Sequence, residues 1–478
     1  MRQWGGFFRA SPPSPVTLAA LTALLRCPAC GGALTFDAVP QPDPEAGTCG
    51  VLRCPCAADY PVLDGVPVLR TGRLDRRSIA DDLVLAPGPD VAAVVSEVEA
   101  GRALGALVDL LAAPLCPWPL NRVGAGRRLS LLGPLRSAGL ALRRRRVRAM
   151  LRRRDRLTAE DWLAAFYLHA PEVYDPFNYF FFRFGTARHL ATLGLVSALP
   201  DPASPVLDLA CGYGHLAHTL TFQGRAVVGL DQNAHQAWLA RHYVAPGAAF
   251  VCADASRPLP FADGAFGAAV CSDAFHYVRD KPGTVAQLDR VSTGGPLLFP
   301  TVGNALVGSP DGHELAPDAY RALFDGWHVR IVTDDAVFAR YRERLGPDLS
   351  ASDPEAEGAK WLAIAASKGD PEDVLRDHGP LDDGPSGWPH AAGHLALNPL
   401  YTPGRVHFEL QMPSPWFEAE NGGLREYMST AVEPTEPLDD LVACAAAVGL
   451  PERYARQHRP WTQRADRALT LAVRRVRG

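Results

Sequence analysis

The stretch VLDLACGYGHLAHTL, from Val206 to Leu220, decides the fold of this chain. An apolar run typical of a buried strand ends near Asp208, and an apolar helical pattern begins at about His215. Between them lie Gly212 and Gly214, which allow positive φ and a close approach of the backbone to a ligand. The first amides of a helix also have no partner within the helix. The stretch therefore predicts a strand, a nucleotide-binding turn and a helix.

The spacing of the turn alone leaves the ligand open. Gly212-x-Gly214-x-x-Ala217 also satisfies the loose dinucleotide-binding fingerprint, which is a weak signal by itself. The next segments are more specific. GRAVVGLDQN predicts a second strand that ends in Asp231, where a carboxylate suits the two hydroxyls of a ribose. GAAFVCADASRPLPFADGAF predicts a third strand ending at Asp254, and GAAVCSDAFHYV and TGGPLLFPTV predict a fourth and a fifth.

Taken together, DLACGYG, GLD, ADASRPLPFADGAF and the following His-Tyr pair resemble class I S-adenosylmethionine-dependent methyltransferases across residues 160–300. The resemblance implies an α/β fold with a Rossmann-like seven-stranded sheet. It implies that the turn faces the methionine part of the cofactor, that Asp231 holds the ribose and that Asp254 faces the adenine edge. Ser272 and Asp273 would lie under the sulfonium. The implied cofactor-binding residues are Asp208, Ala210, Gly212, Gly214, Asp231, Gln232, Asp254, Ala255 and Ser272. Two positions depart from the family pattern: Ala210 replaces the usual first glycine, and Gly267 replaces a usual aspartate.

The N-terminal part of the chain has a pattern typical of a structural zinc site. Five of the ten cysteines lie within residues 27–56, and Cys27-Pro-Ala-Cys30-Gly-Gly has the spacing of a zinc knuckle. The second pair, Cys54 and Cys56, has an irregular C-x-C spacing. We expect Cys27, Cys30, Cys54 and Cys56 to bind zinc, with Cys49 as a substitute for Cys54. The alternative is a small core with free thiols.

Residues 21–72 resemble the zinc-ribbon activator subunits of tRNA and translation-factor methyltransferases. The resemblance rests on Cys27-x-x-Cys30, on Cys56 and on YPVLDGVPVL, from Tyr60 to Leu69. It implies that this unit is a structural or docking module without catalytic residues.

The remaining segments complete the predicted domain organisation. Residues 73–160 form a helical region that ends in the arginine-rich run RRRRVRAMLRRRDR. Residues 161–300 and 436–478 form the methyltransferase domain, with ALTLAVRR at 468–475 as its final strand. Residues 301–435 are then an insertion between the fifth strand and the last helix, and we expect it to act as a substrate lid.

Methyl transfer from a sulfonium is an in-line displacement, so catalysis depends largely on how the acceptor is aligned. An oxygen or nitrogen acceptor often needs a general base. His276 is our first candidate and Tyr277 our second, although a histidine in this place also suits simple packing. Tyr174, Tyr179 or Phe180, which precede the first strand, are candidates to cover the cofactor.

The sequence favours a methyltransferase that acts on an O or N of a small molecule, such as a bacterial natural-product intermediate. Three alternatives stay open: an RNA methyltransferase that uses the arginine run, an enzyme of other chemistry with the same cofactor, and a non-catalytic scaffold. The ribbon or the basic helix offers a surface for a protein partner. The net charge is −4, and no apolar run approaches the roughly 18–20 residues of a membrane span. Clustered cysteines favour metal binding in a reducing cytoplasm.

Overall fold

The structure is a computed structural model. It describes residues 16–77, 84–86, 88–112, 133–167, 176–200, 204–292, 294–307, 312–381, 388–404, 407–433 and 435–456, and of residues 84–86, 133–138 and 403 it describes the backbone. The expected final strand at 468–475 and Tyr174 lie outside the described residues.

The zinc-ribbon unit is a small antiparallel sheet next to helix α1 (Leu18–Leu24). Its strands follow chain order: β1 (Thr35–Ala38), β2 (Gly50–Arg53), β3 (Asp59–Leu63) and β4 (Val66–Pro67). Leu63 and Val66 face each other across a two-residue turn formed by Asp64 and Gly65, whose φ angles are 48° and 80°. An Asp-Gly pair with both φ angles positive is typical of the tight turn that suits the twist of a hairpin.

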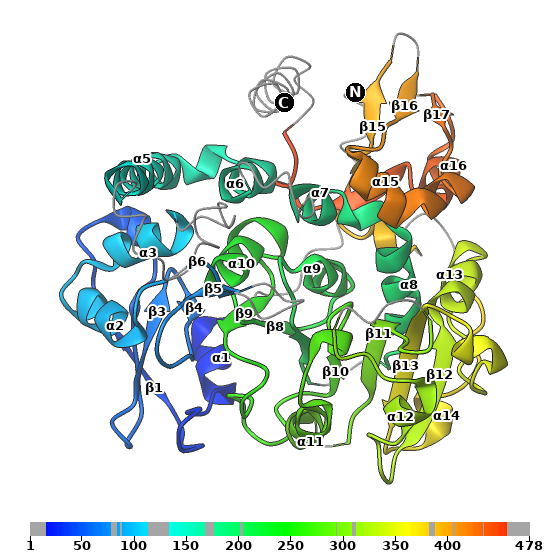
Figure 1. The fold of residues 1–478 in the computed structure, drawn as a ribbon, viewed down its shortest axis with the longest axis horizontal. Helices are drawn as coiled ribbons and strands as arrows, with labels where there is room; N and C mark the ends of the chain where they lie inside the picture. The colour runs from blue at the N-terminus through cyan, green and yellow to red at the C-terminus, as the bar shows by residue number, and fades with distance from the viewer. Residues whose placement is uncertain are drawn as a thin grey trace.

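The ribbon is joined to the large sheet by backbone hydrogen bonds. Val68, directly after β4, forms a parallel bridge with Cys252 at the end of β9, and the Leu69 amide donates to the Cys252 carbonyl at 2.8 Å. The ribbon thereby covers part of an edge strand that would otherwise present unpaired backbone groups. Blue and green segments meet at this place in Figure 1.

The central sheet has seven strands in the order β12-β13-β11-β10-β7-β8-β9. Only β13 runs antiparallel to its neighbours, so the sheet is mixed. The sheet begins in the middle at β7, and the strand order reverses between β7 and β10. In open α/β sheets such a topological switch point is where ligands bind, outside the carboxyl ends of the strands. The strand bounds are β7 (Val206–Leu209), β8 (Val227–Asp231), β9 (Ala249–Cys252), β10 (Ala268–Val270), β11 (Leu297–Gly303), β12 (His328–Thr333) and β13 (Trp361–Ser367).

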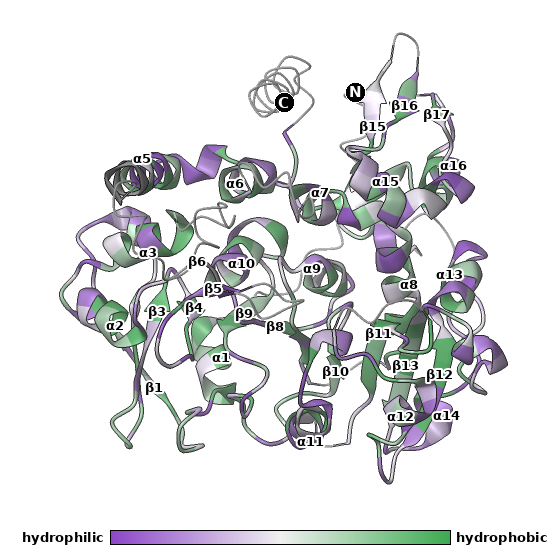
Figure 2. Cartoon of the chain, in the orientation of Figure 1, coloured by the Kyte–Doolittle hydropathy of each residue, from purple (hydrophilic) through white to green (hydrophobic). Residues whose placement is uncertain are grey.

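Alternate residues of these strands contribute to two hydrophobic clusters, one on each face of the sheet. Val206, Val227 and Val270 belong to the first cluster, and their neighbours Leu207 and Val228 belong to the second. Figure 2 shows central strands such as β13 as hydrophobic. The first face is covered by α8 (Ala187–Val196), α9 (His215–Phe222), α10 (Ala234–Leu239) and α13 (Asp334–Arg342), and the second by α1, α11 (Lys281–Ser292) and α12 (Pro317–Arg321).

The expected α/β fold with its seven-stranded sheet is confirmed, but the origin of its last two strands differs from the expectation. β12 and β13 come from residues 301–435, so this range is not a single insertion outside the sheet. HVRIVT and WLAIAAS are short apolar runs, and such runs are not distinguished from buried helical segments by periodicity.

The segment between the ribbon and the sheet is largely helical, as expected. It begins with a short hairpin of β5 (Arg76–Arg77) and β6 (Val84–Ala86). The helices that follow are α2 (Val91–Glu99), α3 (Ala103–Ala112), α5 (Gly133–Leu151), α6 (Ala159–Phe166) and α7 (Pro176–Phe181). Among the described helices, none is long and apolar enough to cross a membrane.

Residues 388–456 form a separate group that lies beside α7 and α8, orange in Figure 1. The expected last helix corresponds to α16, and the strand after it pairs with β14 and not with the central sheet. The elements of this group are β14 (His394–Leu397), β15 (Tyr401–Pro403), β16 (Phe408–Leu410), α15 (Pro415–Asn421), β17 (Ala431–Val432), α16 (Leu438–Ala443) and β18 (Ala447–Leu450); α14 (Pro371–Val374) precedes it.

Candidate functional site

The turn after β7 has the backbone geometry that its glycines predict. Ala210, Gly212 and Gly214 have φ angles of 57°, 54° and 78°. At Gly214, which precedes α9, an added Cβ would lie 3.0 Å from Ala240 and from the ring of Phe250, so this position has no room for a side chain. The turn is thus closely packed against the sheet, and its backbone faces the carboxyl end of the strands.

The acidic residue of β8 is bonded directly to this turn. The Gly212 amide donates to Asp231 Oδ2 at 3.0 Å, and the Asn233 amide donates to Oδ1 at 2.8 Å. Asp231 is 2% exposed, and burial raises the pKa of its carboxyl to about 6. Gly212 and Asp231, which are 19 positions apart, are therefore joined by a hydrogen bond at the switch point of the sheet.

Asp208 lies at the start of the same turn and is also buried. Burial, followed by the charge of Asp231, raises the pKa of its carboxyl to about 7. Its Oδ2 atom has no hydrogen-bond partner within the described part of the chain. A carboxyl with a free acceptor atom next to the turn fits a ligand that brings hydrogen-bond donors, such as an amino acid ammonium.

The expected cofactor-binding residue Gln232 follows β8, and the residues expected at the adenine edge, Asp254 and Ala255, follow β9. The Gln232 carbonyl accepts a hydrogen bond from Arg70 Nη1 at 2.7 Å, so the segment after the ribbon reaches the end of β8. Asp254 accepts from the Ser256 amide at 3.0 Å and from its hydroxyl at 2.6 Å, which forms a tight turn that includes Ala255.

The segment after β10 joins Ser272 and Asp273, which the sequence analysis named, to Arg183 and Thr192, which it did not. Asp273 has a φ of 52° and accepts hydrogen bonds at Oδ2 from the Tyr179 hydroxyl at 2.5 Å and from Arg183 Nη1 at 3.0 Å. Burial acts to raise the pKa of Asp273, but the charges of Arg183, Arg188 and His276 and the hydrogen bond from Tyr179 together lower it. Next to it, the hydroxyls of Ser272 and Thr192 are 2.9 Å apart. An ionised carboxylate at this edge suits a cationic sulfonium.

His276 and Tyr277, the expected catalytic residues, lie in the short helical turn Phe275–Tyr277. The His276 ring is 1% exposed, and within the described residues neither ring nitrogen has a hydrogen-bond partner. It packs against the rings of Tyr277 and Trp361, with centroids 4.0 Å and 5.6 Å away. Burial lowers the pKa of His276, so the imidazole is neutral at pH 7 and can accept a proton.

A further buried acid, Asp334, is the first residue of α13 and is bonded to β11. Asp334 accepts hydrogen bonds from the Thr301 amide at 3.1 Å and the Thr301 hydroxyl at 2.6 Å, and burial raises the pKa of Asp334 to about 7. Thr301 has a φ of 57°, which is rare for a β-branched residue, and it lies at a bulge in the strand. Positive φ at Ala210, Asp273 and Thr301 concentrates backbone strain at one edge of the sheet, as functional sites often do.

The four expected zinc ligands lie together in the ribbon. The thiol sulfurs of Cys27, Cys30, Cys54 and Cys56 are all within 4.8 Å of one another. Three of the sulfur–sulfur distances are 3.7 Å, 3.4 Å and 3.3 Å. A tetrahedral zinc ion with Zn–S bonds of about 2.3 Å places its sulfurs about 3.8 Å apart, so the cluster fits zinc.

The chemistry of the cluster also suits a metal. Burial acts to raise the pKa of Cys27, but hydrogen bonds from the Tyr60 hydroxyl and from backbone amides lower the pKa to about 7. Cys49 does not belong to the cluster: its thiol donates to the Ala46 carbonyl, and burial raises its pKa to about 11. The C-x-C pair therefore supplies both remaining ligands.

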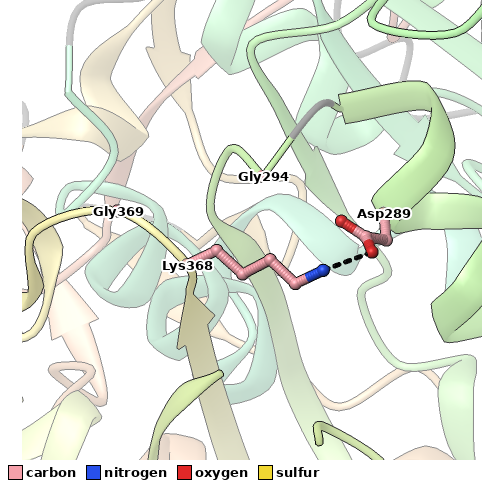
Figure 3. Close-up of a pocket in the computed structure, with 4 residues that line it drawn as sticks. All are labelled: Asp289, Gly294, Lys368 and Gly369. Atoms are coloured by element: carbon pink, nitrogen blue, oxygen red, sulfur yellow. Dashed lines mark hydrogen bonds and ion pairs between the residues drawn. The ribbon is translucent and has the colours of Figure 1, made fainter. Parts of the chain in front are cut away.

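A surface pocket at the opposite edge of the sheet is separate from this site. Figure 3 shows its lining, in which Lys368 Nζ and Asp289 Oδ2 form an ion pair at 2.5 Å beside Gly294 and Gly369. Gly294 precedes β11, and Lys368 follows β13, so the pocket lies at the amino end of β11, away from the turn.

Comparison with known proteins identifies the central domain. Residues 207–299 match the family described as "Methyltransferase domain". No curated protein matches the chain. The chain is similar to an S-adenosylmethionine-dependent methyltransferase from Mesorhizobium loti, with 18% identity, 38% of this chain and 98% of that chain covered, and a TM-score of 0.30. The chain is also similar to one in a complex between the Haloferax volcanii Trm112 methyltransferase activator and a candidate methyltransferase. The identity is 19%, the match covers 44% of this chain and 97% of that chain, and the TM-score is 0.31.

The chain thus contains a class I S-adenosylmethionine-dependent methyltransferase domain and an N-terminal four-cysteine cluster consistent with a zinc ribbon.

Proposed function

We propose that this protein transfers a methyl group from S-adenosylmethionine to an oxygen or nitrogen of a small molecule, such as an intermediate of bacterial natural-product synthesis. The hydrogen bond from the Gly212 amide to Asp231 carries the cofactor part of the proposal, because it joins the glycine turn to the ribose carboxylate at the switch point. The sulfonium, when bound, supplies an electrophilic methyl group.

In this proposal the cofactor is held by residues at the carboxyl ends of four strands, β7, β8, β9 and β10. The turn residues Asp208, Ala210, Gly212 and Gly214 contact its methionine part, Asp231 and Gln232 its ribose, and Asp254 and Ala255 its adenine. Ser272 and the ionised Asp273 lie beside the sulfonium. Tyr179 and Arg183 are positioning residues, because their hydrogen bonds hold the Asp273 carboxylate.

The acceptor proton needs a destination when the acceptor is an oxygen or nitrogen. We propose His276 as the first base and Tyr277 as the second. A neutral imidazole whose two ring nitrogens have no partner among the described residues suits a proton acceptor. The new bond joins the acceptor atom to the methyl carbon, the carbon–sulfur bond breaks, and the base takes the proton.

A small acceptor is favoured by the group of residues 388–433, which packs on the segment that carries Tyr179 and Arg183. The Tyr427 hydroxyl donates to the Gly185 carbonyl at 2.6 Å, and Arg188 pairs with Glu420 at 3.2 Å. The rings of Phe182 and Phe417 are 5.8 Å apart. We propose that this part of the expected lid encloses the acceptor, which leaves little space for a macromolecule.

One observation favours RNA as a second candidate acceptor. Six arginines near the end of α5 are exposed within ten residues, which is the kind of cluster that binds phosphates. They are Arg144, Arg145, Arg146, Arg148, Arg152 and Arg153.

Methyl transfer from tritium-labelled cofactor distinguishes the two acceptors. The zinc-loaded protein is incubated with either a small-molecule extract or total RNA, with Asp231→Ala as the inactive control. Label in the small-molecule fraction alone supports the proposal, whereas label in RNA alone contradicts it in favour of the second candidate.

A further inference from the structure

Arg76, on strand β5, is a buried cation, and no ion pair joins it to an acidic residue in the described part of the chain. Its side chain is 3% exposed, and Nη2 donates to the Leu110 and Leu111 carbonyls at 2.6 Å and 3.0 Å in the last turn of α3. Its Nε and Nη1 atoms have no hydrogen-bond partner in the described part of the chain. Burial lowers the pKa of Arg76 to about 10, which still leaves it charged at pH 7. Arginine is almost never fully buried unless it is paired.

His235, on α10, contributes a second buried donor at the same place. Both side chains contact Phe166: the Arg76 guanidinium lies 5.4 Å from the ring centroid, and the His235 ring lies edge-on to it at 5.4 Å. The His235 Nε2 atom also has no partner among the described residues. Burial and then the charge of Arg76 lower the pKa of His235. Two elements thus present three unpaired nitrogens to one small region.

This region adjoins the cofactor turn. The rings of His235 and Tyr213 are 6.1 Å apart, and Tyr213 lies between Gly212 and Gly214. On the other side, the Arg77 amide donates to Asn233 Oδ1 at 3.0 Å, and the Asn233 amide is bonded to Asp231. Strand β5 is therefore fixed to the same residues that organise the turn and the ribose carboxylate.

We infer that Arg76 and His235 form a binding site for an oxyanion, a carboxylate or a phosphate, next to the cofactor turn. Such a group supplies a negative charge next to Arg76. Its oxygens accept hydrogen bonds from Nε and Nη1 of Arg76 and from Nε2 of His235. Two sources have this chemistry: the carboxylate of the cofactor, whose location rests on the proposed function, and a free phosphate. The role is one of binding and positioning, since neither side chain touches the reacting atoms.

The test compares two ligands that differ in the anion. S-adenosylhomocysteine carries the amino acid carboxylate, and methylthioadenosine has the same nucleoside without it. Calorimetry gives the dissociation constants of both for the wild type, Arg76→Met, His235→Phe and Arg73→Met. Arg73 lies on the same linker, but its side chain is 57% exposed, so it serves as the matched control.

If the cofactor supplies the anion, Arg76→Met weakens S-adenosylhomocysteine by about tenfold or more and leaves methylthioadenosine unchanged, because a charge-assisted hydrogen bond is lost. The ratio of the two constants does not depend on how stable the variant is. His235→Phe changes the ratio in the same direction, and Arg73→Met leaves it unchanged.

A second arm measures the melting temperature with and without inorganic phosphate, in the absence of cofactor. If phosphate is the source, it stabilises the wild type and Arg73→Met but not Arg76→Met. The inference is overturned if Arg76→Met changes neither the ligand ratio nor the stabilisation by phosphate. A wild type that binds neither nucleoside contradicts the proposed function instead, and the phosphate arm still tests the oxyanion site.

Discussion

Asp64 offers a direct test of how the ribbon is attached to the methyltransferase domain. Its carboxylate is 4% exposed, and Oδ2 accepts from Arg154 Nη1 at 2.7 Å and Trp238 Nε1 at 3.0 Å. His242 Nε2 is bonded to the Asp64 backbone carbonyl at 3.1 Å and lies 3.2 Å from Oδ2. Asp64→Asn keeps the shape and tolerates the positive φ of 48°, so it removes mainly the charge. Two hydrogen bonds and the ion-pair contact with His242 lose their charged partner, and each becomes weaker by about 1 kcal/mol. Because Arg154 is partly exposed, we expect a loss of about 2–3 kcal/mol.

The effect can be measured by hydrogen exchange of the β3–β4 hairpin, whose opening detaches the ribbon. A loss of about 2–3 kcal/mol corresponds to exchange that is roughly 30- to 140-fold faster. The control is Asp37→Asn in the same ribbon: Asp37 is 59% exposed and pairs with Arg53, which also pairs with Asp59 and Glu99. We expect the control to change exchange less than threefold. Equal rates in the two variants would refute the reasoning.

The pH dependence of this contact follows from the same charge. Burial acts to raise the pKa of Asp64, but its hydrogen bond with His242 and the charges of His242 and Arg154 lower it. A carboxyl whose pKa is lower in the folded state stabilises the fold above its unfolded pKa, and this contribution is lost as the pH falls through the folded value. The effect of Asp64→Asn is therefore expected to be full at pH 7.

Three further predictions concern acid stability, the metal and the turn. Burial lowers the pKa values of three histidines to about 3 or 4; they are His215, His218 and His390. Each is expected to reduce the free energy of unfolding by at most about 1.4 kcal/mol per pH unit as the pH falls from 6.5 to 4. The urea midpoint is therefore expected to be lower at pH 5 than at pH 7. A pH-independent midpoint would contradict this. Elemental analysis is expected to find no bound zinc in Cys54→Ser and one equivalent in Cys49→Ser, because Cys54 belongs to the four-cysteine cluster and Cys49 does not. Gly214→Ala is expected to lower the melting temperature more than Gly224→Ala, because both have positive φ but only Gly214 lacks room for a Cβ; equal shifts would show that packing is unimportant.

Local patterns were sufficient to predict the turn and the metal cluster. Gly212, Gly214 and Asp231 stand at fixed offsets from apolar strands, and the parallel sheet brings their ends to one edge. The cysteine pairs likewise carry their ligand spacing in the sequence, and the structure needed only to exclude Cys49. These features depend on short segments whose conformation is set by neighbouring residues.

Contacts between distant segments were not predictable in this way. Tyr179 and Arg183 meet Asp273 across about 90 positions, and Asp334 meets Thr301 across 33. No spacing rule connects such pairs, because they depend on how α7 and α13 pack on the sheet. For the same reason β12 and β13 were not predicted as strands of the central sheet. Their apolar runs indicate buried segments but do not show which strands they pair with.

The most direct test of the central claim is a calorimetric titration of the zinc-loaded protein with S-adenosylhomocysteine, alongside Asp231→Ala. We predict micromolar binding by the wild type and a loss of affinity of about tenfold or more in the variant, because the ribose carboxylate and the bond to the Gly212 amide are removed together. Absence of binding by the wild type, or equal binding by both proteins, would contradict a cofactor site at this turn.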